Sequence, residues 1–387
     1  MFNSFNLAEL HLPPNLAELR QEVRDFIAEE LKAGSFRRNP DGWDCWDEDF
    51  SRKVASRGWI GMTWPKQYGG QERTALERFV VSEELLMAGA PIRAHWLADR
   101  QFGPLLLAHG TEAQKQNYLP RIVAGEIFFC VGLSEPDSGS DLASIRTRAE
   151  KVEGGWRIEG RKVWTSYAHR AQMLTLFART SPRTETGRHG GVSQLLVDLR
   201  NTPGLTVRPI YNLAGEHDFN ELVFDGAMLP DDALIGTVDN GWAQISGELA
   251  HERSGPERWS NTYGVILSLL EEISPDPTRV QAEALGRLVS HIWTLHRMSF
   301  AIAGMLERGK TPDVEAALVK DLGNGFDQEV PAVARKVLSE SMRAASPRRD
   351  ELEAMLARAI YYAPSYTIRG GTKEILRGIV AKGLGLR

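Results

Sequence analysis

The chain has 387 residues, a length that suits two or three domains of ordinary size. Apolar residues make up 42% and charged residues 25%, a globular composition that excludes a mostly disordered, collagen-like or coiled-coil chain. The 46 basic residues fall short of the 51 acidic ones, which gives a net charge of −5 and argues against a nucleic-acid-binding protein.

The cysteines and histidines give no sign of a metal site. Cys45 and Cys130 are too few for a disulfide scaffold or a four-thiolate metal centre, and the histidines are scattered. The N-terminal residues MFNSFNLAEL lack the basic and apolar regions of a signal peptide, and no long apolar run suits a membrane span. These features favour a cytoplasmic protein without a resident metal.

The pattern of apolar residues changes twice along the chain. Helical spacing begins at Leu16 and returns over residues 76–88 and 112–123, which predicts an N-terminal helical domain over residues 1–126. A period near two, punctuated by glycine-containing pairs, then predicts a β-domain over residues 127–236. Helical spacing after Gly241 predicts a C-terminal helical bundle over residues 237–387. The expected fold class is therefore α+β multidomain, in the order helices, sheet, helices.

Two segments of the predicted β-domain suit a ligand. The loop from Leu133 to Asp141 is rich in small residues and hydroxyls, which suits a polar or phosphorylated ligand but also describes an ordinary loop. Trp164 is followed by two hydroxyl residues at a strand end. It would either form a flat apolar wall for a planar heteroaromatic group or lie in the core of the sheet.

One predicted helix carries a carboxylate on its apolar face. From Trp242 to Leu270, a stripe in alternating steps of three and four residues is apolar or aromatic except at Glu252. Pro256 cannot donate to the carbonyl of Glu252, so we expect a long helix that kinks there. Two interpretations stay open from the pattern alone: a buried ion pair with an arginine of another helix, or a general base.

Several common catalytic motifs are missing from the sequence. There is no GxGxxG after a strand, no GxxxxGK[ST], no HExxH and no GxSxG. Rossmann, P-loop, zinc-protease and serine-hydrolase interpretations therefore have no support.

Six segments in order resemble the acyl-CoA dehydrogenase family of flavoproteins. They are WPKQYGG at residues 64–70, the helix region 109–126, SEPDSGSD at 134–141 (TEPxxGSD in the family), WTS at 164–166, the segment 224–236, and GGTKEILR at 370–377 (EGTxxIQR in the family). The resemblance implies an N-terminal helical domain, a central β-barrel-like domain and a C-terminal four-helix bundle.

The resemblance also implies FAD as the cofactor, held between the β-domain and the bundle. The matching cofactor-binding positions are Val131, Leu133, Ser134, Gly139, Ser140, Trp164, Thr165, Ser166 and Thr372. The implied reaction is α,β-desaturation of an acyl-CoA, in which a glutamate removes the α-proton and the β-hydrogen leaves as hydride to flavin N5. Electrons would pass to an electron-transferring flavoprotein, and the usual assembly is a dimer of dimers.

The catalytic glutamate is not at its commonest position. Many members place it in the C-terminal motif, where this chain has Gly370. A smaller group places it on the first helix of the C-terminal bundle, directly before an arginine, which here gives Glu252 as the base and Arg253 as a CoA contact. Gly370 would still offer its N–H to the thioester carbonyl. Gly371 would make room for substrate, and members of this group often accept branched or bulky, sterol-like acyl groups.

Two family motifs that bind FAD across a subunit interface are absent. Residues 271–277 replace R-x-x-F-G, and residues 346–359 replace Q-x-x-G-G. These departures put the ordinary homotetramer in question, so that a homotetramer and a heterotetramer of α2β2 type both stay open. Three alternatives also stay open from the sequence: an acyl-CoA oxidase, a flavin monooxygenase of the same fold, and a flavin-binding partner subunit without catalysis, which the retained Glu252 argues against.

Overall fold

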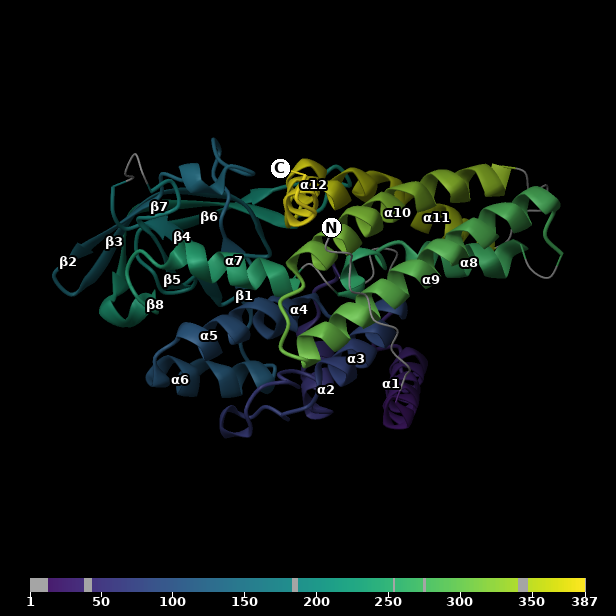
Figure 1. The fold of residues 1–387 in the computed structure, drawn as a ribbon, viewed down its shortest axis with the longest axis horizontal. Helices are drawn as coiled ribbons and strands as arrows, with labels where there is room; N and C mark the ends of the chain where they lie inside the picture. The colour runs from purple at the N-terminus through teal and green to yellow at the C-terminus, as the bar shows by residue number, and fades with distance from the viewer. Residues whose placement is uncertain are drawn as a thin grey trace. The chain divides into compact units, whose positions relative to one another are not determined.

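The computed structural model describes residues 13–37, 44–182, 187–252, 255–273, 276–339 and 347–386. The chain forms two compact units, each assembled from separate stretches of sequence. A first, helical unit combines Met1–Phe50, Arg73–Arg93 and Glu252–Arg387, and a second unit combines Ser51–Glu72 with Ala94–His251. Along the chain, the predicted order of helices, sheet and helices is confirmed (Figure 1).

The second unit is built around a mixed sheet. Its strands are β1 (Phe129–Gly132), β2 (Arg148–Val152), β3 (Gly155–Ser166), β4 (Met173–Arg179), β5 (Val192–Asp198), β6 (Leu205–Ile210), β7 (Phe219–Pro230) and β8 (Leu234–Ile235). They follow the order β6-β7-β3-β2-β4-β5-β8, with β1 added parallel to β4. β4 and β5 are buried along almost their whole length, as expected for strands rich in leucine and valine.

Helices flank this sheet at both ends of its sequence. α5 (Gly103–His109) and α6 (Glu112–Val123) precede it, after α2 (Glu48–Ser56), α4 (Arg93–Leu97) and the π-helical turn η3 (Ala98–Phe102). α7 (Gly241–Glu252) follows the sheet and packs Ile245 against Phe177 of β4 and Val192 of β5. Among the described residues, no helix is both long and apolar enough to cross a membrane.

The first unit is helical. It contains α1 (Pro14–Lys32), α3 (Ala75–Met87), α8 (Tyr263–Ile273), α9 (Arg279–Glu307), α10 (Asp313–Ser339), α11 (Pro347–Tyr362) and α12 (Lys373–Gly383). Helices α8 to α11 run alongside one another in a bundle (Figure 1). Their core includes Leu288 of α9, Val330 of α10 and Leu352 of α11, all fully buried. The faces of α1 and α9 that carry apolar residues at helical spacing are the buried faces.

The expected long helix through Glu252 is wrong. α7 ends at Glu252, a 3-10 turn η6 (Pro256–Arg258) follows, and α8 begins only at Tyr263. The proline therefore does more than kink the helix, because it starts a separate turn after Gly255. Residues spaced for one continuous stripe, such as Trp259 and Ile266, are still buried, but on different elements.

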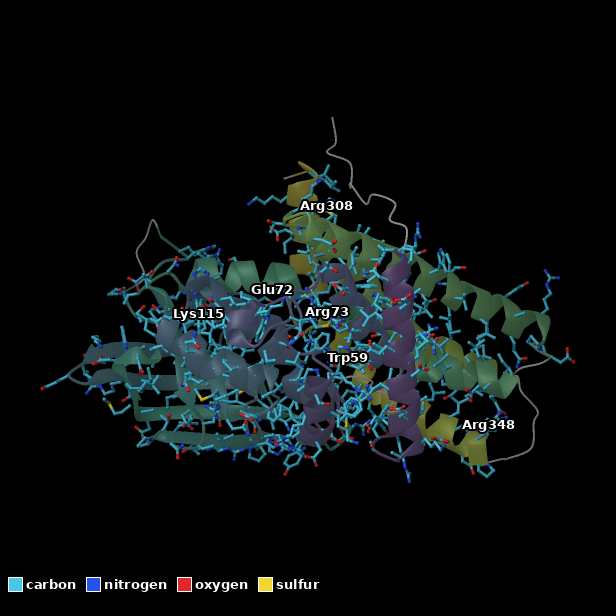
Figure 2. The ribbon with its side chains drawn as sticks, turned by 90° about the horizontal axis from the view of Figure 1, so that it is seen from below. Trp59, Glu72, Arg73, Lys115, Arg308 and Arg348 are labelled. Carbon is cyan, nitrogen blue, oxygen red and sulfur yellow. The ribbon has the colours of Figure 1, made fainter. Side chains whose placement is uncertain are left out.

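The charged segment SPRRD at residues 346–350 has the composition of a short linker. Pro347 starts α11 instead. Arg348 lies exposed in the first turn of this helix, and Arg308 lies exposed just after the end of α9 (Figure 2). Proline is well suited to a first helical position, because its missing N–H has no helical partner there.

Candidate functional site

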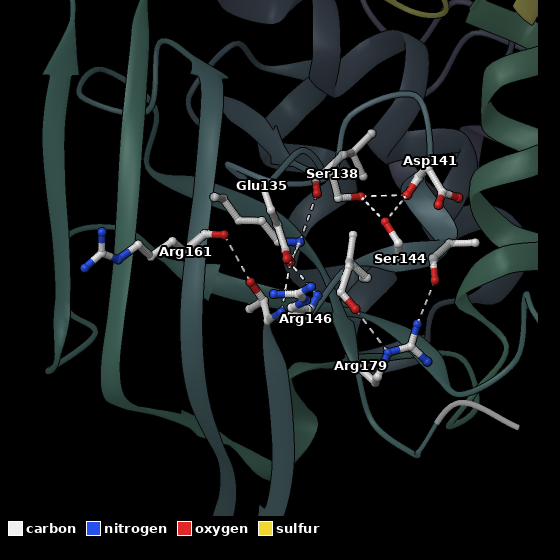
Figure 3. A network of polar contacts seen from close by, with 12 residues as sticks. Glu135, Ser138, Asp141, Ser144, Arg146, Arg161 and Arg179 are labelled. Carbon is white, nitrogen blue, oxygen red and sulfur yellow. Dashed lines mark hydrogen bonds and ion pairs between the residues drawn. The ribbon is translucent and has the colours of Figure 1, made fainter.

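A buried ion pair supports the start of the loop 133–141. The side chain of Lys162, on β3, is fully buried, and its Nζ donates to Glu135 Oε1 at 2.8 Å and to the Leu133 carbonyl at 2.9 Å. The Glu135 carboxylate also accepts from the backbone N–H groups of Arg146 (2.7 Å) and Thr147 (2.9 Å) (Figure 3). One carboxylate thus ties the loop to β3 and to the segment before β2.

Both members of this pair carry their charge at neutral pH. Burial lowers the pKa of Lys162 to about 8, although the neighbouring Glu135 opposes this shift. For Glu135, burial acts to raise the pKa, but the charge and hydrogen bonds of Lys162 and the backbone donors outweigh it, so the pKa lies below its usual value. Removing one partner would leave the other as an uncompensated buried charge, which typically destabilises a protein by about 3–5 kcal/mol.

The rest of the loop is held by its own hydrogen bonds. Glu135 and Ser138 exchange backbone bonds of 2.7 and 3.1 Å, and the hydroxyls of Ser138 and Ser144 both donate to the Asp141 carbonyl (Figure 3). Gly139, at the exposed tip, does not have a positive φ, and a Cβ placed on it would meet nothing within 4 Å in the described structure. Neither its backbone conformation nor packing within the described residues therefore requires a glycine at this position.

Trp164 lies in a strained and exposed position. Its φ is +59°, in the left-handed region, and the pairing of β3 with β7 shifts register between Lys162 and Thr165. The indole is 59% exposed and meets Phe219 edge to face at 5.9 Å. The interpretation of Trp164 as a core residue of the sheet is therefore wrong. A bulge that turns a large aromatic side chain outward is typical of a binding site.

Thr165 adds a buried hydroxyl next to Trp164 on the same strand. Its Oγ1 is buried and has no hydrogen-bond partner among the described residues, while its carbonyl accepts from Asn220 Nδ2 at 3.0 Å. A buried hydroxyl without a partner costs free energy, so such atoms commonly face a ligand or water. The Val163 N–H donates to the Ser134 carbonyl at 2.9 Å, which joins the loop to the same strand end.

The structure thus brings together most of the cofactor-binding positions predicted in the second unit. Val131 is half-buried on β1, where Gly132 lies against the Lys162 side chain. Leu133 and Ser134 are tied to Lys162 and Val163, and Ser166 ends β3. Gly139 and Ser140 lie at the exposed tip of the loop.

The remaining described positions form a separate turn in the first unit. Gly370 and Gly371 have φ values of +65° and +107°, which side chains rarely adopt, so a glutamate at position 370 would be strained in this conformation. Thr372 caps α12 by accepting from the Ile375 N–H at 3.5 Å. A cofactor-binding role for Thr372 therefore stays a prediction beside this structural one.

The predicted base lies where the described structure stops. α7 carries the backbone to Glu252, its last residue, but the side chain of Glu252 and the whole of Arg253 lie outside the described residues. The assignments of Glu252 as base and of Arg253 as substrate contact stay predictions.

Sequence reasoning missed a buried polar layer beside the turn at 369–372. Lys320, Asn324 and Asp327 lie on one face of α10 and are almost fully buried. Asp327 accepts from Thr262 Oγ1 (2.9 Å) and Thr262 N–H (3.1 Å), and burial raises its pKa to about 6. Their spacing of four and three residues was the available signal, because polar residues on the apolar face of a helix require partners.

Comparison with known proteins identifies the family. Residues 13–126 match the acyl-CoA dehydrogenase N-terminal domain, and residues 130–227 match the acyl-CoA dehydrogenase middle domain. The chain is 31% identical to acyl-CoA dehydrogenase IpdE1 of Mycobacterium tuberculosis, over 95% of this chain and 97% of that protein. It is also 31% identical to FadE34 of the same organism, but spans only 45% of that longer protein.

Solved structures agree with this assignment. The steroid ACAD Tcur3481-Tcur3483 aligns with a TM-score of 0.85 at 28% identity, covering 98% of this chain and 99% of that one. The ChsE4-ChsE5 complex from Mycobacterium tuberculosis aligns with a TM-score of 0.80 at 26% identity, covering 98% and 99%. In the described part of the chain, no group of histidine, cysteine and acidic residues could hold a metal ion. The chain belongs to the acyl-CoA dehydrogenase family and is an oxidoreductase of that type.

Proposed function

We propose that the chain desaturates an acyl-CoA thioester between its α and β carbons, with FAD as cofactor and Glu252 as the base. The observation that carries the proposal is the strand end at 164–166. There the exposed indole of Trp164 lies on a strained bulge, next to the buried Thr165 hydroxyl, which has no hydrogen-bond partner within the described part of the chain. This arrangement suits a planar, hydrogen-bonding ring system better than a role in folding.

The residues present fit FAD. The indole of Trp164 would cover a flat ring, Thr165 Oγ1 would hydrogen-bond to it, and the open tip at Gly139 and Ser140 would approach a polar part of the cofactor. When bound, FAD would supply the acceptor for the two electrons and the β-hydrogen.

The chain's own groups would handle the proton and the carbonyl. Glu252 would take the α-proton as the bond between the α-carbon and this hydrogen breaks. The electron pair of that bond would form the new double bond as the β-hydrogen leaves with two electrons. The Gly370 N–H would donate to the thioester oxygen, where negative charge develops in the transition state. Donors placed at such an oxygen are typically worth about 10²–10³ in kcat.

A bulky, sterol-like acyl group is the substrate class that we propose. Gly370 and Gly371 leave the substrate side of the turn without side chains, and a solved relative is described as a steroid ACAD. The base expected from the resemblance, on the first helix of the C-terminal bundle, supports the same substrate class.

The test is an anaerobic titration of the purified protein with acyl-CoAs from short straight chains to branched and steroid-linked ones. Bleaching of the flavin absorption by bulky acyl-CoAs, with an enoyl-CoA product two mass units lighter, is the expected result. A flavin that no acyl-CoA bleaches would contradict the proposal. Rapid reoxidation in air with peroxide would instead indicate an acyl-CoA oxidase.

We also propose a heteromeric assembly, in which a related second subunit completes the FAD sites. The absence of both cross-subunit motifs supports this, as does the two-protein description of ChsE4-ChsE5. We expect the chain expressed alone to hold little FAD and to gain it on co-expression with a partner. A stable homotetramer with one FAD per subunit would contradict the proposed heteromer but not the proposed desaturation.

An electron-transferring flavoprotein is the acceptor that we propose.

A further inference from the structure

A fully buried asparagine lies opposite the end of β3. Asn220, on β7, is paired with Thr165 across the two antiparallel strands and is 0% exposed. Its Nδ2 donates to the Thr165 carbonyl at 3.0 Å. Because a buried amide without hydrogen-bond partners costs free energy, both ends of the Asn220 side chain need a partner.

The oxygen end of this amide is bound by a histidine. Asn220 Oδ1 lies 2.8 Å from Nε2 of His217, in the loop before β7. A carbonyl can only accept a hydrogen bond, so the amide nitrogen must face Thr165 and the amide oxygen must face His217. His217 therefore carries a proton on Nε2 and donates it to this oxygen. One orientation of the Asn220 amide satisfies both partners.

A second histidine completes this cluster. The ring of His169, in the turn after β3, stacks on the ring of His217 with 3.7 Å between centroids and 18° between planes. His169 Nδ1 lies 3.2 Å from the Asn220 amide. Burial lowers the pKa of His169 to about 4, and the charge of His217 acts in the same direction, so His169 is neutral at neutral pH. The two histidines come from the segments after β3 and before β7, and the cluster therefore holds the end of this strand pair together.

The anchor acts where the strand is irregular. The register of β3 against β7 shifts between Lys162 and Thr165, and Trp164 has a φ of +59°. A backbone in this region persists only where its surroundings hold it. Pairing resumes at Thr165 opposite Asn220, so the Asn220 side chain fixes the first paired residue after the bulge.

An anchored carbonyl at Thr165 also sets the direction of its hydroxyl. Threonine is branched at Cβ, so few side-chain rotamers are open to it once its backbone is fixed. The hydroxyl oxygen is buried and has no hydrogen-bond partner among the residues that the structure describes. The bond from Asn220 thus holds in place an oxygen that these residues leave available to a ligand.

We propose that Asn220 is a positioning residue that directs the Thr165 hydroxyl at the flavin ring, an inference that rests on the proposed FAD site. Asn220 forms no bond to the cofactor and takes no part in proton or hydride transfer. It acts through the Thr165 backbone, and His217 acts through Asn220 by fixing the direction of its amide. Loss of the Asn220 amide should therefore weaken FAD binding, but only while Thr165 keeps its hydroxyl.

The test is a double-mutant cycle on FAD affinity with Asn220→Leu and Thr165→Val, in the protein assembled with any partner that it needs to hold FAD. Leucine keeps the branched shape of asparagine without its polar atoms, and valine keeps the shape of threonine without its hydroxyl. Equilibrium dialysis measures the Kd of FAD, the absorption spectrum reports the surroundings of the bound flavin, and Tm reports the stability of each variant.

Gln114→Leu is the matched control. Gln114, on α6, is also a buried amide of the second unit, and it donates to the backbone carbonyls of Asp232 at 2.8 Å and Leu234 at 2.9 Å. Neither carbonyl belongs to β3. Gln114→Leu should therefore lower Tm but keep the Kd of FAD within about twofold of the wild type, as for a site distant from the ligand.

Each single variant of the cycle should weaken FAD binding about tenfold, as for loss of one hydrogen bond to the cofactor. The double variant should also bind about tenfold more weakly than the wild type, and not about a hundredfold, because both changes remove the same bond. The flavin absorption maximum should shift equally in all three variants. His217→Phe should weaken FAD binding in the same direction but less.

A loss of about a hundredfold in the double variant, the product of two independent losses, would overturn the inference. So would wild-type affinity in Asn220→Leu, or a loss that only follows a lowered Tm with an unmoved flavin band. If Asn220→Leu does not fold, unchanged FAD affinity in a folded His217→Phe protein would overturn it. A wild type that holds no FAD overturns the proposed function first, whereas a wild type that binds FAD with an additive cycle overturns this inference alone.

Discussion

The two units each contain a glycine-containing loop bonded to a fully buried lysine, but different groups accept the bonds that the structure describes for the two lysines. Lys162 faces the carboxylate of Glu135 at 2.8 Å, and this carboxylate distributes the anchoring to two backbone N–H groups. Lys320 donates instead to backbone carbonyls of the turn at 369–371. In the first case a salt bridge fixes the loop. In the second the lysine bonds directly to the backbone of the turn.

The difference teaches that a buried lysine can hold a loop either through a carboxylate or by direct bonds to backbone carbonyls. Removal of Lys162 leaves the Glu135 carboxylate buried without this cation, whereas removal of Lys320 takes one donor from the carbonyls of Arg369 and Gly371. The comparison therefore predicts a large loss of stability on removal of Lys162.

Replacing Lys162 with methionine should have the largest effect on stability. It leaves Glu135 buried without its cation, so we expect unfolding to become easier by about 3–5 kcal/mol and FAD to be lost. Chemical unfolding and flavin absorbance measure both quantities. The double variant Lys162→Met with Glu135→Gln should recover part of the stability, since it removes the unpaired charge. No loss in the single variant would remove the distinction between the two lysines.

The pH dependence of the free energy of unfolding tests the role of Asp327 in the buried polar layer beside the turn at 369–372. The pKa of Asp327 is raised from 3.8 to about 6 in the folded state, so its contribution to stability is full below pH 4 and is lost as the pH rises through 6. The shift of about two pKa units corresponds to roughly 3 kcal/mol. We expect the stability of the wild type relative to Asp327→Asn to fall by about this amount between pH 4 and 7. A difference that does not change with pH would show that Asp327 does not titrate there.

Replacing Trp164 with alanine should affect the cofactor and not the fold. The indole is 59% exposed, so its removal exposes little core, and we expect Tm to change by only a few degrees. We expect FAD to bind about tenfold more weakly, as for loss of one aromatic stacking partner worth about 1–3 kcal/mol. Equilibrium dialysis against FAD measures this, with Met228→Ala, another exposed residue of the sheet, as control. An equal loss of FAD in both variants would contradict the role of Trp164.

Much of this architecture follows from local pattern. The buried faces of α1 and α9 and the bounds of α6 are readable from helical spacing, and the strands from alternation and turn residues. The break after Glu252 is not, because a stripe of apolar residues continues across it even though the backbone bonds cannot pass Pro256.

The candidate site is readable only in part. The loop at 134–141 and the Trp164 segment carry recognisable motifs, and Gly370, which has no side chain, is what led to the prediction of Glu252 as the base. Two features depend on the register of β3 against β7. They are the bulge that turns Trp164 outward and the buried Thr165 hydroxyl, which has no hydrogen-bond partner among the described residues. The bond from Lys320 to the Arg369 carbonyl joins residues about fifty positions apart, which no local pattern reveals.

The most direct measurement of the central claim is a single anaerobic turnover with Glu252→Gln, beside the wild type and Glu257→Gln. Glu257 is the matched control because it is another carboxylate of the same stretch, buried next to Arg258. We predict that Glu252→Gln keeps FAD and binds the acyl-CoA, but bleaches the flavin at least about 10³ times more slowly, as for loss of a general base. Glu257→Gln should bleach at a rate near that of the wild type. Near-native bleaching and enoyl-CoA formation by Glu252→Gln would contradict the account.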